Sequence, residues 1–210
     1  MQDLLKRLGV EFAGSKQERA QKTLDDLLEA ALQLVETGDP ESFTARNVAK
    51  ISGYALGTVS RQLVHIENVF LWAIEERRRQ NFEDLIEFID NADPNYKSQY
   101  FSYDVADFCI ERISLVKPKV MIFFEARILK RAEYVSDLIS YPDMVIPHII
   151  GLTEKNQSGT FRNINQDNAK LIVRSLAVAV ERPFLESDPI AGTKDHREQL
   201  ADLIYRLLQA

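Results

Sequence analysis

The segment from residue 43 to residue 70 constrains the fold of this chain most strongly, because its pattern predicts two short helices joined by a tight turn. Thr44 is a favourable N-cap for the first helix, whose apolar positions lie on one side. Gly53 fits the turn, since glycine accepts a positive φ at no steric cost. A second helix is expected from about Ala55, with Val59 packed against the first helix. This is the helix-turn-helix pattern, whose second helix fits the DNA major groove.

The charges of this segment suit a contact with nucleic acid. Between Thr44 and Ile66 there are three cations, Arg46, Lys50 and Arg61, and no carboxylate. The whole chain of 210 residues carries a net charge of −6. Any contact with DNA phosphates would therefore have to come from this local patch.

Gly57 stands out within the expected second helix, because glycine in a helix interior costs about 1 kcal/mol relative to alanine. Two explanations remain open from the sequence. Either another molecule comes close to this part of the backbone, or Gly57 lets two helices of the chain pack tightly.

The stretch from Thr23 to Phe70 resembles the DNA-binding domain of the TetR (tetracycline repressor) family of bacterial regulators. The resemblance is carried by Ala30-Ala31, Gly38, Phe43-Thr44, Val48-Ala49, Gly53, Gly57-Thr58-Val59, Arg61 and Leu63. It implies an all-α protein with a three-helix DNA-binding head and a helical body. It also implies a homodimer that binds a pseudo-palindromic double-stranded DNA operator as a repressor and responds to a small-molecule effector.

The chain departs from the family pattern at three positions. Ser60 stands where the family usually has a tyrosine that touches a phosphate, and Ala55 replaces the usual serine cap of the second helix. Ile66 occupies the place of a phosphate-contacting lysine. These departures favour the main alternative, a helical small-molecule-binding protein with a weakened or vestigial helix-turn-helix.

We expect seven residues of the helix-turn-helix to contact DNA. Thr44 and Arg46 would meet phosphates or base edges, and Leu56 could meet a thymine methyl group. The full expected set is Thr44, Arg46, Leu56, Gly57, Thr58, Ser60 and Arg61.

Helical periodicity continues along the rest of the chain, and no segment shows a sustained strand pattern, so we expect an all-α fold. Asp93-Pro94-Asn95 interrupts the pattern and is the expected domain boundary. The expected parts are an N-terminal arm over 1–15, the helix-turn-helix domain over 16–65, a connecting helix over 66–92, and a ligand-binding and dimerisation domain over 93–210.

The middle of the connecting helix carries the run Glu75-Glu76-Arg77-Arg78-Arg79. An arginine run could touch phosphate, but a solvated helix face with Glu–Arg pairs is the more common structure for such a pattern. We therefore expect this run to face solvent.

Aromatic residues gather in the expected body around a few polar side chains, as ligand pockets require, although each aromatic by itself is more often part of a core. Arg127 shares a helix face with Phe123 and needs an anionic partner, which could be Glu125, Asp107 or a carboxylate on a ligand. The expected ligand-binding residues are Tyr103, Phe108, Phe123, Phe124, Arg127 and His148.

The last two expected helices, over 166–181 and 194–208, have the most extensive apolar faces. A helix that is apolar nearly all round must be buried on several sides, so these helices are expected to form a four-helix bundle between two subunits. The expected interface residues are Leu171, Leu176, Val180, Leu200, Leu203, Ile204 and Leu207.

Catalytic and metal-binding patterns are weak. The three histidines are far apart, and there is neither a glycine-rich phosphate loop nor a C-x-x-C pair. We therefore expect no metal and no cofactor, and an enzyme acting on a small anion through Arg127 and His148 is a distant third alternative. The single cysteine, Cys109, is expected to be buried and inert, and no apolar run approaches the ~20 residues of a membrane span. A cytoplasmic protein is the expectation.

Overall fold

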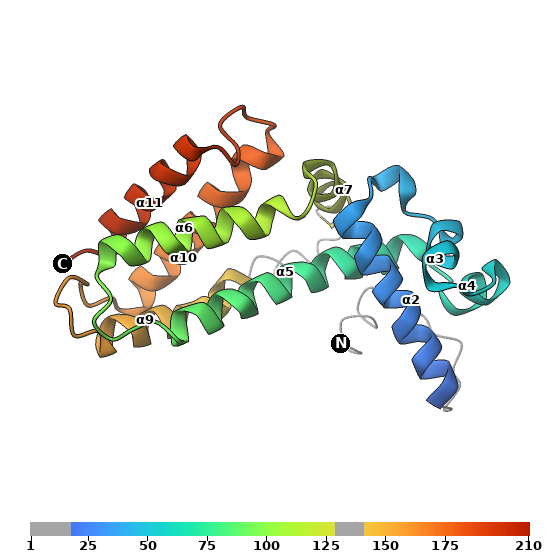
Figure 1. Ribbon diagram of the computed structural model, residues 1–210, viewed down its shortest axis with the longest axis horizontal. Helices are drawn as coiled ribbons and strands as arrows, with labels where there is room; N and C mark the ends of the chain where they lie inside the picture. The colour runs from blue at the N-terminus through green and yellow to red at the C-terminus, as the bar shows by residue number, and fades with distance from the viewer. Residues whose placement is uncertain (1–17, 129–140) are drawn as a thin grey trace. The chain divides into compact units, whose positions relative to one another are not determined.

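The computed structural model describes residues 18–128 and 141–210 (Figure 1). The expected N-terminal arm over 1–15 lies outside these residues. The described residues form helices and contain no strand, so the all-α expectation is confirmed. The α-helices are α2 (Glu18–Thr37), α3 (Ala45–Ser52), α4 (Leu56–Gln62), α5 (Ile66–Asp90), α6 (Ser98–Ser114), α7 (Pro118–Ile128), α9 (Ile146–Lys155), α10 (Gln166–Leu185) and α11 (Lys194–Leu208).

Helix α9 is preceded by a short helix of another type. A 3-10 helix, Tyr141–Val145, comes first, and α9 then starts at Ile146. Pro147 lies in the first turn of α9, where the missing backbone N–H is not needed for a helical hydrogen bond. The proline therefore determines where the α-helix can begin.

The chain divides into two compact units. The head unit contains the described residues up to Arg78 together with Lys119–Arg127. The body unit contains Arg79–Pro118 and the described residues of Ile128–Ala210. The division falls inside α5 and assigns most of α7 to the head unit, which differs from the boundary expected at Asp93.

Local chemistry explains how the helix pair of the head unit forms. The side-chain oxygen of Thr44 accepts a hydrogen bond from the Asn47 backbone N–H at 3.2 Å, as an N-cap should. Gly53 ends α3 with φ at +76°, a left-handed conformation that favours glycine. On the inner side, Val48 of α3 and Val59 of α4 are fully buried.

The run over residues 75–79 does not form the solvated face expected from sequence, and that expectation is wrong. Glu75 and Glu76 are only 3% and 4% exposed. Within the head unit, Arg77 pairs with Glu36 of α2 at 3.3 Å, and Arg78 lies over the Phe124 ring of α7 at 5.7 Å. Helices that are distant in sequence cover this stretch of α5, which the local pattern cannot reveal.

In the body unit, α11 packs against α6 along much of its length (Figure 1). Phe101 and Ile110 of α6 and Ile204 and Leu208 of α11 are almost completely buried. These side chains form the core of the body unit and fix α11 to α6.

Candidate nucleic-acid interface

Buried residues on the inner side of α4 fix the helix in the head unit, and this determines which residues its outer face presents. Val59 is fully buried and Leu63, which follows the helix, is 2% exposed, so these residues anchor α4 in the head unit. The positions between them point outward. The exposed residues in and around α4 are Ala55, Leu56, Gly57, Ser60, Arg61, Val64 and His65.

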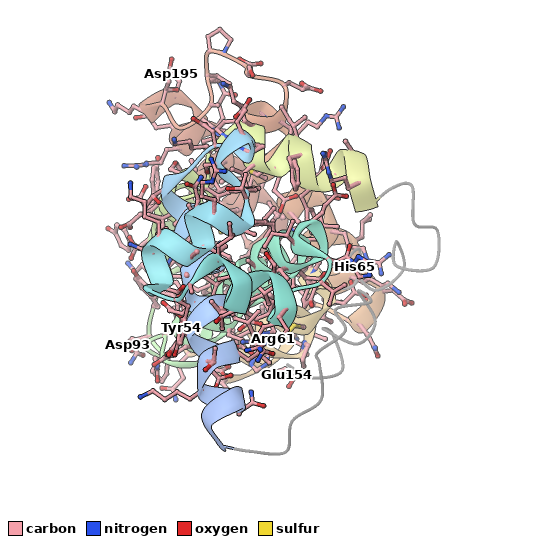
Figure 2. The ribbon with its side chains drawn as sticks, turned by 90° about the vertical axis from the view of Figure 1, so that its right-hand side faces the viewer. Tyr54, Arg61, His65, Asp93, Glu154 and Asp195 are labelled. Atoms are coloured by element: carbon pink, nitrogen blue, oxygen red, sulfur yellow. The ribbon has the colours of Figure 1, made fainter. Side chains whose placement is uncertain are left out.

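Most of the expected DNA-contacting residues lie on the surface of the head unit. Leu56, Gly57, Ser60 and Arg61 are exposed on α4, whereas Thr58 is half-buried. Of these residues, Arg61 is labelled in Figure 2. At the start of α3, Thr44 and Arg46 are also exposed. The hydroxyl oxygen of Thr44 already accepts the Asn47 N–H, but the hydroxyl hydrogen remains available to an outside acceptor.

The cations of the helix-turn-helix differ from the arginines of the body unit in their pairing. Arg46, Lys50 and Arg61 are exposed and have no ion-pair partner among the described residues. In the body unit, every described arginine except Arg162 is in an ion pair: Arg79–Glu83, Arg112–Asp84, Arg174–Asp143, Arg182–Glu186, Arg197–Asp107 and Arg206–Asp202. Among the described residues, therefore, no carboxylate competes with phosphates for these three cations.

Gly57 is not needed for packing between described parts of the chain. A Cβ atom built on Gly57 would meet nothing within 4 Å. By contrast, a Cβ atom on Gly38 would lie 2.3 Å from the Ser42 hydroxyl oxygen and 2.6 Å from the Leu34 carbonyl oxygen. The tight-packing explanation of Gly57 is thus contradicted for the described residues, and an open stretch of helix backbone remains on the outer face of α4.

Two polar residues that the sequence did not single out hold the helix-turn-helix together. The Tyr54 hydroxyl, in the turn between α3 and α4, donates a hydrogen bond to the Asp26 carboxylate of α2 at 2.8 Å. The Asn47 side chain donates to the Ser42 carbonyl at 2.8 Å. Both contacts position α3 and α4, and neither follows a local motif that would have identified it.

The structure does not bring the six expected ligand-binding residues together in one unit. Phe123, Phe124 and Arg127 lie in the head unit, whereas Tyr103, Phe108 and His148 lie in the body unit. Phe124 is buried within the head unit. The ring of Phe123 meets the ring of Phe43 edge-on, with centroids 5.4 Å apart.

The three body-unit residues of that set have different environments. Tyr103 is 45% exposed. The Phe108 ring lies 5.7 Å from the ring of Phe88, and the His148 Nδ1 atom lies 2.8 Å from the Asp90 carboxylate. Each of the three residues thus has different neighbours.

Arg127 forms an ion pair with a carboxylate of the protein. This carboxylate belongs to neither Glu125 nor Asp107, the two protein partners considered from sequence. Its Nε atom lies 3.2 Å from a carboxylate oxygen of Glu67, in the first turn of α5. Its guanidinium also covers the Phe123 ring at 3.6 Å. Asp107, one of the expected partners, pairs instead with Arg197 in the body unit at 2.7 Å.

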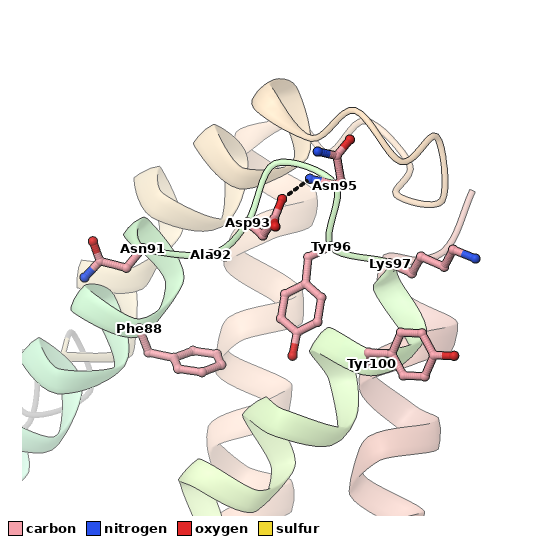
Figure 3. A pocket seen from close by; sticks show the side chains of 8 residues that line it. All are labelled: Phe88, Asn91, Ala92, Asp93, Asn95, Tyr96, Lys97 and Tyr100. Atoms are coloured by element: carbon pink, nitrogen blue, oxygen red, sulfur yellow. Dashed lines mark hydrogen bonds between the residues drawn. The ribbon is translucent and has the colours of Figure 1, made fainter.

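The body unit has a pocket of about 500 Å³ at the turn between α5 and α6 (Figure 3). Its lining residues are Phe88, Asn91, Ala92, Asp93, Asn95, Tyr96, Lys97 and Tyr100. None of the expected ligand-binding residues is among them. The turn is fixed by two hydrogen bonds, from the Gln157 N–H to the Pro94 carbonyl at 2.6 Å and from the Asn156 side chain to the Tyr96 carbonyl at 2.8 Å.

The seven expected interface residues divide into three groups within the body unit. Val180, Leu200 and Ile204 are buried inside their own chain, so the expectation that they face a second subunit is wrong. Leu200 and Ile204 are buried because α11 packs on α6 of the same chain. Leu171 is 69% exposed and Leu203 37% exposed. Leu176 and Leu207 are half-buried.

The described residues hold neither a reactive thiol at Cys109 nor a cluster of metal-ligating side chains. Burial of the Cys109 thiol raises its pKa to about 12, so the reactive thiolate does not form at neutral pH. Within residues 18–128 and 141–210, no group of three or more metal-ligating side chains comes together. In the same part of the chain, no helix is long and apolar enough to cross a membrane.

No protein-family model matches the chain, and no curated protein has a similar sequence. Solved structures do match it in fold. One is a protein assigned to the TetR family of transcription regulators, from Shewanella sp. PV-4, with a TM-score of 0.52 and 16% sequence identity. The match covers 90% of this chain and 98% of that one.

A second similar structure is a TetR family member from Streptomyces coelicolor A3, with a TM-score of 0.52 and 15% identity. This match covers 90% of the present chain and 99% of the other. Both similarities extend over nearly the whole length of the solved chains. The protein therefore has the fold of TetR family transcription regulators.

Proposed function

We propose that the protein is a DNA-binding transcriptional regulator whose helix α4 enters the DNA major groove. The observation that carries the proposal is the outer face of the helix-turn-helix. It combines exposed cations that have no ion-pair partner within residues 18–128 and 141–210, a sequence without carboxylates, and an open helix backbone at Gly57. Phosphate contacts would come from Thr44 and Arg46, and groove contacts from Leu56, Gly57, Thr58, Ser60 and Arg61 on α4.

The proposed regulator acts as a homodimer and a repressor. A dimer would present two copies of α4 about one DNA turn apart (~34 Å) or slightly more, which matches a pseudo-palindromic operator. Support for the dimer comes from the exposed apolar side chains of the adjacent helices α10 and α11. These are Leu171, Val178 and Leu203, which are 69%, 61% and 37% exposed. Leu176 and Leu207 would complete the same interface.

The proposed regulator also responds to a small-molecule effector. The pocket at the α5–α6 turn supports this part of the proposal, since its volume lies within the usual range for ligand sites (~300–1,000 Å³). Phe88, Tyr96 and Tyr100 supply aromatic surface, and Lys97 supplies a cation without an ion-pair partner among the described residues. An effector would lower operator affinity by favouring a dimer state whose heads do not match the half-site spacing.

The alternative is a ligand-binding protein whose helix-turn-helix no longer reads DNA. Ser60, Ala55 and Ile66 favour it, because none of them supplies the cap or the phosphate contact usual in the resembling family. The local charge pattern favours the regulator, because Arg46 and Arg61 are exposed and no carboxylate occurs between Thr44 and Ile66.

Salt-dependent binding to a mixed-sequence DNA duplex separates the two proposals. We expect wild-type protein to bind at low salt, with affinity that falls steeply as salt rises because bound counterions are released. Arg46→Ala should reduce the slope of log affinity against log salt by about one unit. Arg162→Ala, which removes an exposed and unpaired arginine of the body unit, is the matched control and should leave the slope unchanged.

Two results would contradict the regulator. One is the absence of DNA binding by the wild-type protein at low salt. The other is an equal loss of slope in Arg46→Ala and Arg162→Ala, which would mean that charge anywhere on the chain drives the binding.

A further inference from the structure

His65 is an exposed side chain in the connection between α4 and α5 that has no assigned role. It follows α4, which ends at Gln62, and its carbonyl oxygen accepts hydrogen bonds from the N–H groups of Asn68 and Val69. These bonds fix the backbone of His65 at the start of α5. No hydrogen bond or ion pair engages its imidazole ring within the described residues.

Arg61 and His65, both labelled in Figure 2, are exposed side chains of the head unit. Val64, between them in sequence, is 54% exposed as well. The exposed residues of α4 are therefore followed directly by two further exposed residues, Val64 and His65. A DNA duplex bound along α4 would come close to these two residues.

The charged residues that flank His65 in sequence favour an anion. Arg61 is the nearest charged residue before it in sequence, and no carboxylate occurs between Thr44 and Ile66. Glu67, in the first turn of α5, is the nearest acid along the chain. The Glu67 carboxylate is paired at 3.2 Å with Arg127 of α7, so its negative charge is compensated.

We propose that His65 is an additional phosphate-binding residue of the DNA interface and that its protonation is coupled to DNA binding. The inference rests on the proposed regulator function. A phosphate next to an imidazole favours the protonated form, because the opposite charge stabilises the cation. On binding, a proton from the buffer would add to the free ring nitrogen, which then donates a hydrogen bond to a phosphate oxygen, and no covalent bond to DNA forms.

This coupling predicts that acid strengthens DNA binding. By linkage, a one-unit difference in proton affinity between free and bound protein corresponds to about a tenfold change in DNA affinity.

The test measures the affinity of the full chain for the mixed-sequence duplex at pH 6, 7 and 8 and constant ionic strength. We expect wild-type affinity to decrease by about threefold to tenfold from pH 6 to pH 8. His65→Gln should lose this dependence and bind at pH 6 about as weakly as the wild type does at pH 8. His65→Lys, which places a permanent cation at this position, should bind strongly at all three pH values.

Salt dependence provides a second readout that a purely structural role would not change. At pH 6, His65→Gln should reduce the slope of log affinity against log salt by about one unit, and at pH 8 the reduction should be absent. Circular dichroism checks that the helix content of each variant equals that of the wild type, as expected for a folded chain.

The outcomes distinguish this inference from the proposed function. If the wild type binds DNA but its affinity does not change with pH, or if His65→Gln keeps the wild-type pH dependence, the role of His65 is overturned and the regulator stands. If the wild type binds no DNA at any pH, both proposals fail together.

Discussion

The rings of Phe43 and Phe70 stack face to face in the head unit, with centroids 4.4 Å apart and planes 8° from parallel. Phe43 directly precedes Thr44, the N-cap of α3, and Phe70 lies in the buried part of α5. The edge of the Phe123 ring of α7 completes the cluster at 87° to Phe43. These three rings connect the start of α3 to α5 and α7.

Replacing one ring of this cluster should destabilise the head unit. Phe43→Ala removes a side chain that is 9% exposed and leaves a cavity between Phe70 and Phe123, so we expect a loss of about 3–5 kcal/mol of unfolding free energy. Urea unfolding monitored by circular dichroism measures the loss. Phe43→Leu retains most of the volume and serves as the control, with an expected smaller loss. Equal stability of wild type and Phe43→Ala would show that the stacked pair does not stabilise the unit.

Gly57→Ala should make the protein more stable and weaken its DNA binding. The new methyl group meets nothing within 4 Å, and alanine is favoured over glycine in a helix by about 1 kcal/mol. The same methyl group would stand between the α4 backbone and DNA. Thermal unfolding measures the stability, and binding to a duplex measures the DNA affinity.

Gly151→Ala is the matched control for this substitution. Gly151 lies inside α9 of the body unit, and a Cβ atom there also meets nothing within 4 Å. We expect the same gain in stability from Gly151→Ala with unchanged DNA affinity. If both variants bind DNA like the wild type, the open backbone at Gly57 is not a contact surface.

A charge on the exposed face of α10 should prevent dimer formation without unfolding the chain. Leu171 and Val178 are seven residues apart and highly exposed, so they lie on one side of α10. Leu171→Asp would place a carboxylate in the proposed interface. Sedimentation equilibrium should give a dimer for the wild type and a monomer for this variant. Leu115→Asp, at a residue that is 42% exposed just after α6, is the control and should remain dimeric.

The Asp143–Arg174 pair of the body unit should make stability depend on pH in acid. The Arg174 side chain donates two hydrogen bonds to the Asp143 carboxylate, at 2.8 and 2.7 Å, and these hold the pKa of Asp143 below its ordinary value. The stabilisation is complete above the ordinary pKa of an aspartate, about 3.9, and is lost as the pH falls through the lowered value.

Asp143→Asn tests this pair. The variant should melt at a slightly lower temperature than the wild type at neutral pH, and the difference should shrink as the pH falls well below 4. Differential scanning calorimetry at several pH values measures both quantities. A difference in melting temperature that stays constant from neutral to acid pH would contradict the assigned role of the pair.

Local chemistry made the helix-turn-helix predictable from sequence. Thr44 caps α3 and Gly53 adopts a positive φ because each conformation depends on the residue itself and its near neighbours. Helix α11 was predicted over its observed range for a similar reason, since its apolar periodicity is continuous. Features of this kind do not require knowledge of what the segment packs against.

Partners distant in sequence explain the predictions that failed. The carboxylates of Glu75 and Glu76 are buried because other helices cover α5, and Arg127 pairs with Glu67, which lies 60 residues earlier in the sequence. The apolar face of a helix likewise does not indicate, from sequence alone, whether the same chain or a second subunit covers it. Leu200 and Ile204 were expected to face a second subunit, but α6 of the same chain covers α11.

Selection from a random pool of double-stranded DNA, with Arg61→Ala and Arg162→Ala selected in parallel, tests the central proposal most directly. We predict that the wild type and Arg162→Ala enrich the same inverted repeat and that Arg61→Ala does not. Arg61 is an exposed cation of α4, and no described residue forms an ion pair with it. No enrichment by the wild type at low salt, or equal enrichment by Arg61→Ala, would contradict the proposal that α4 reads DNA.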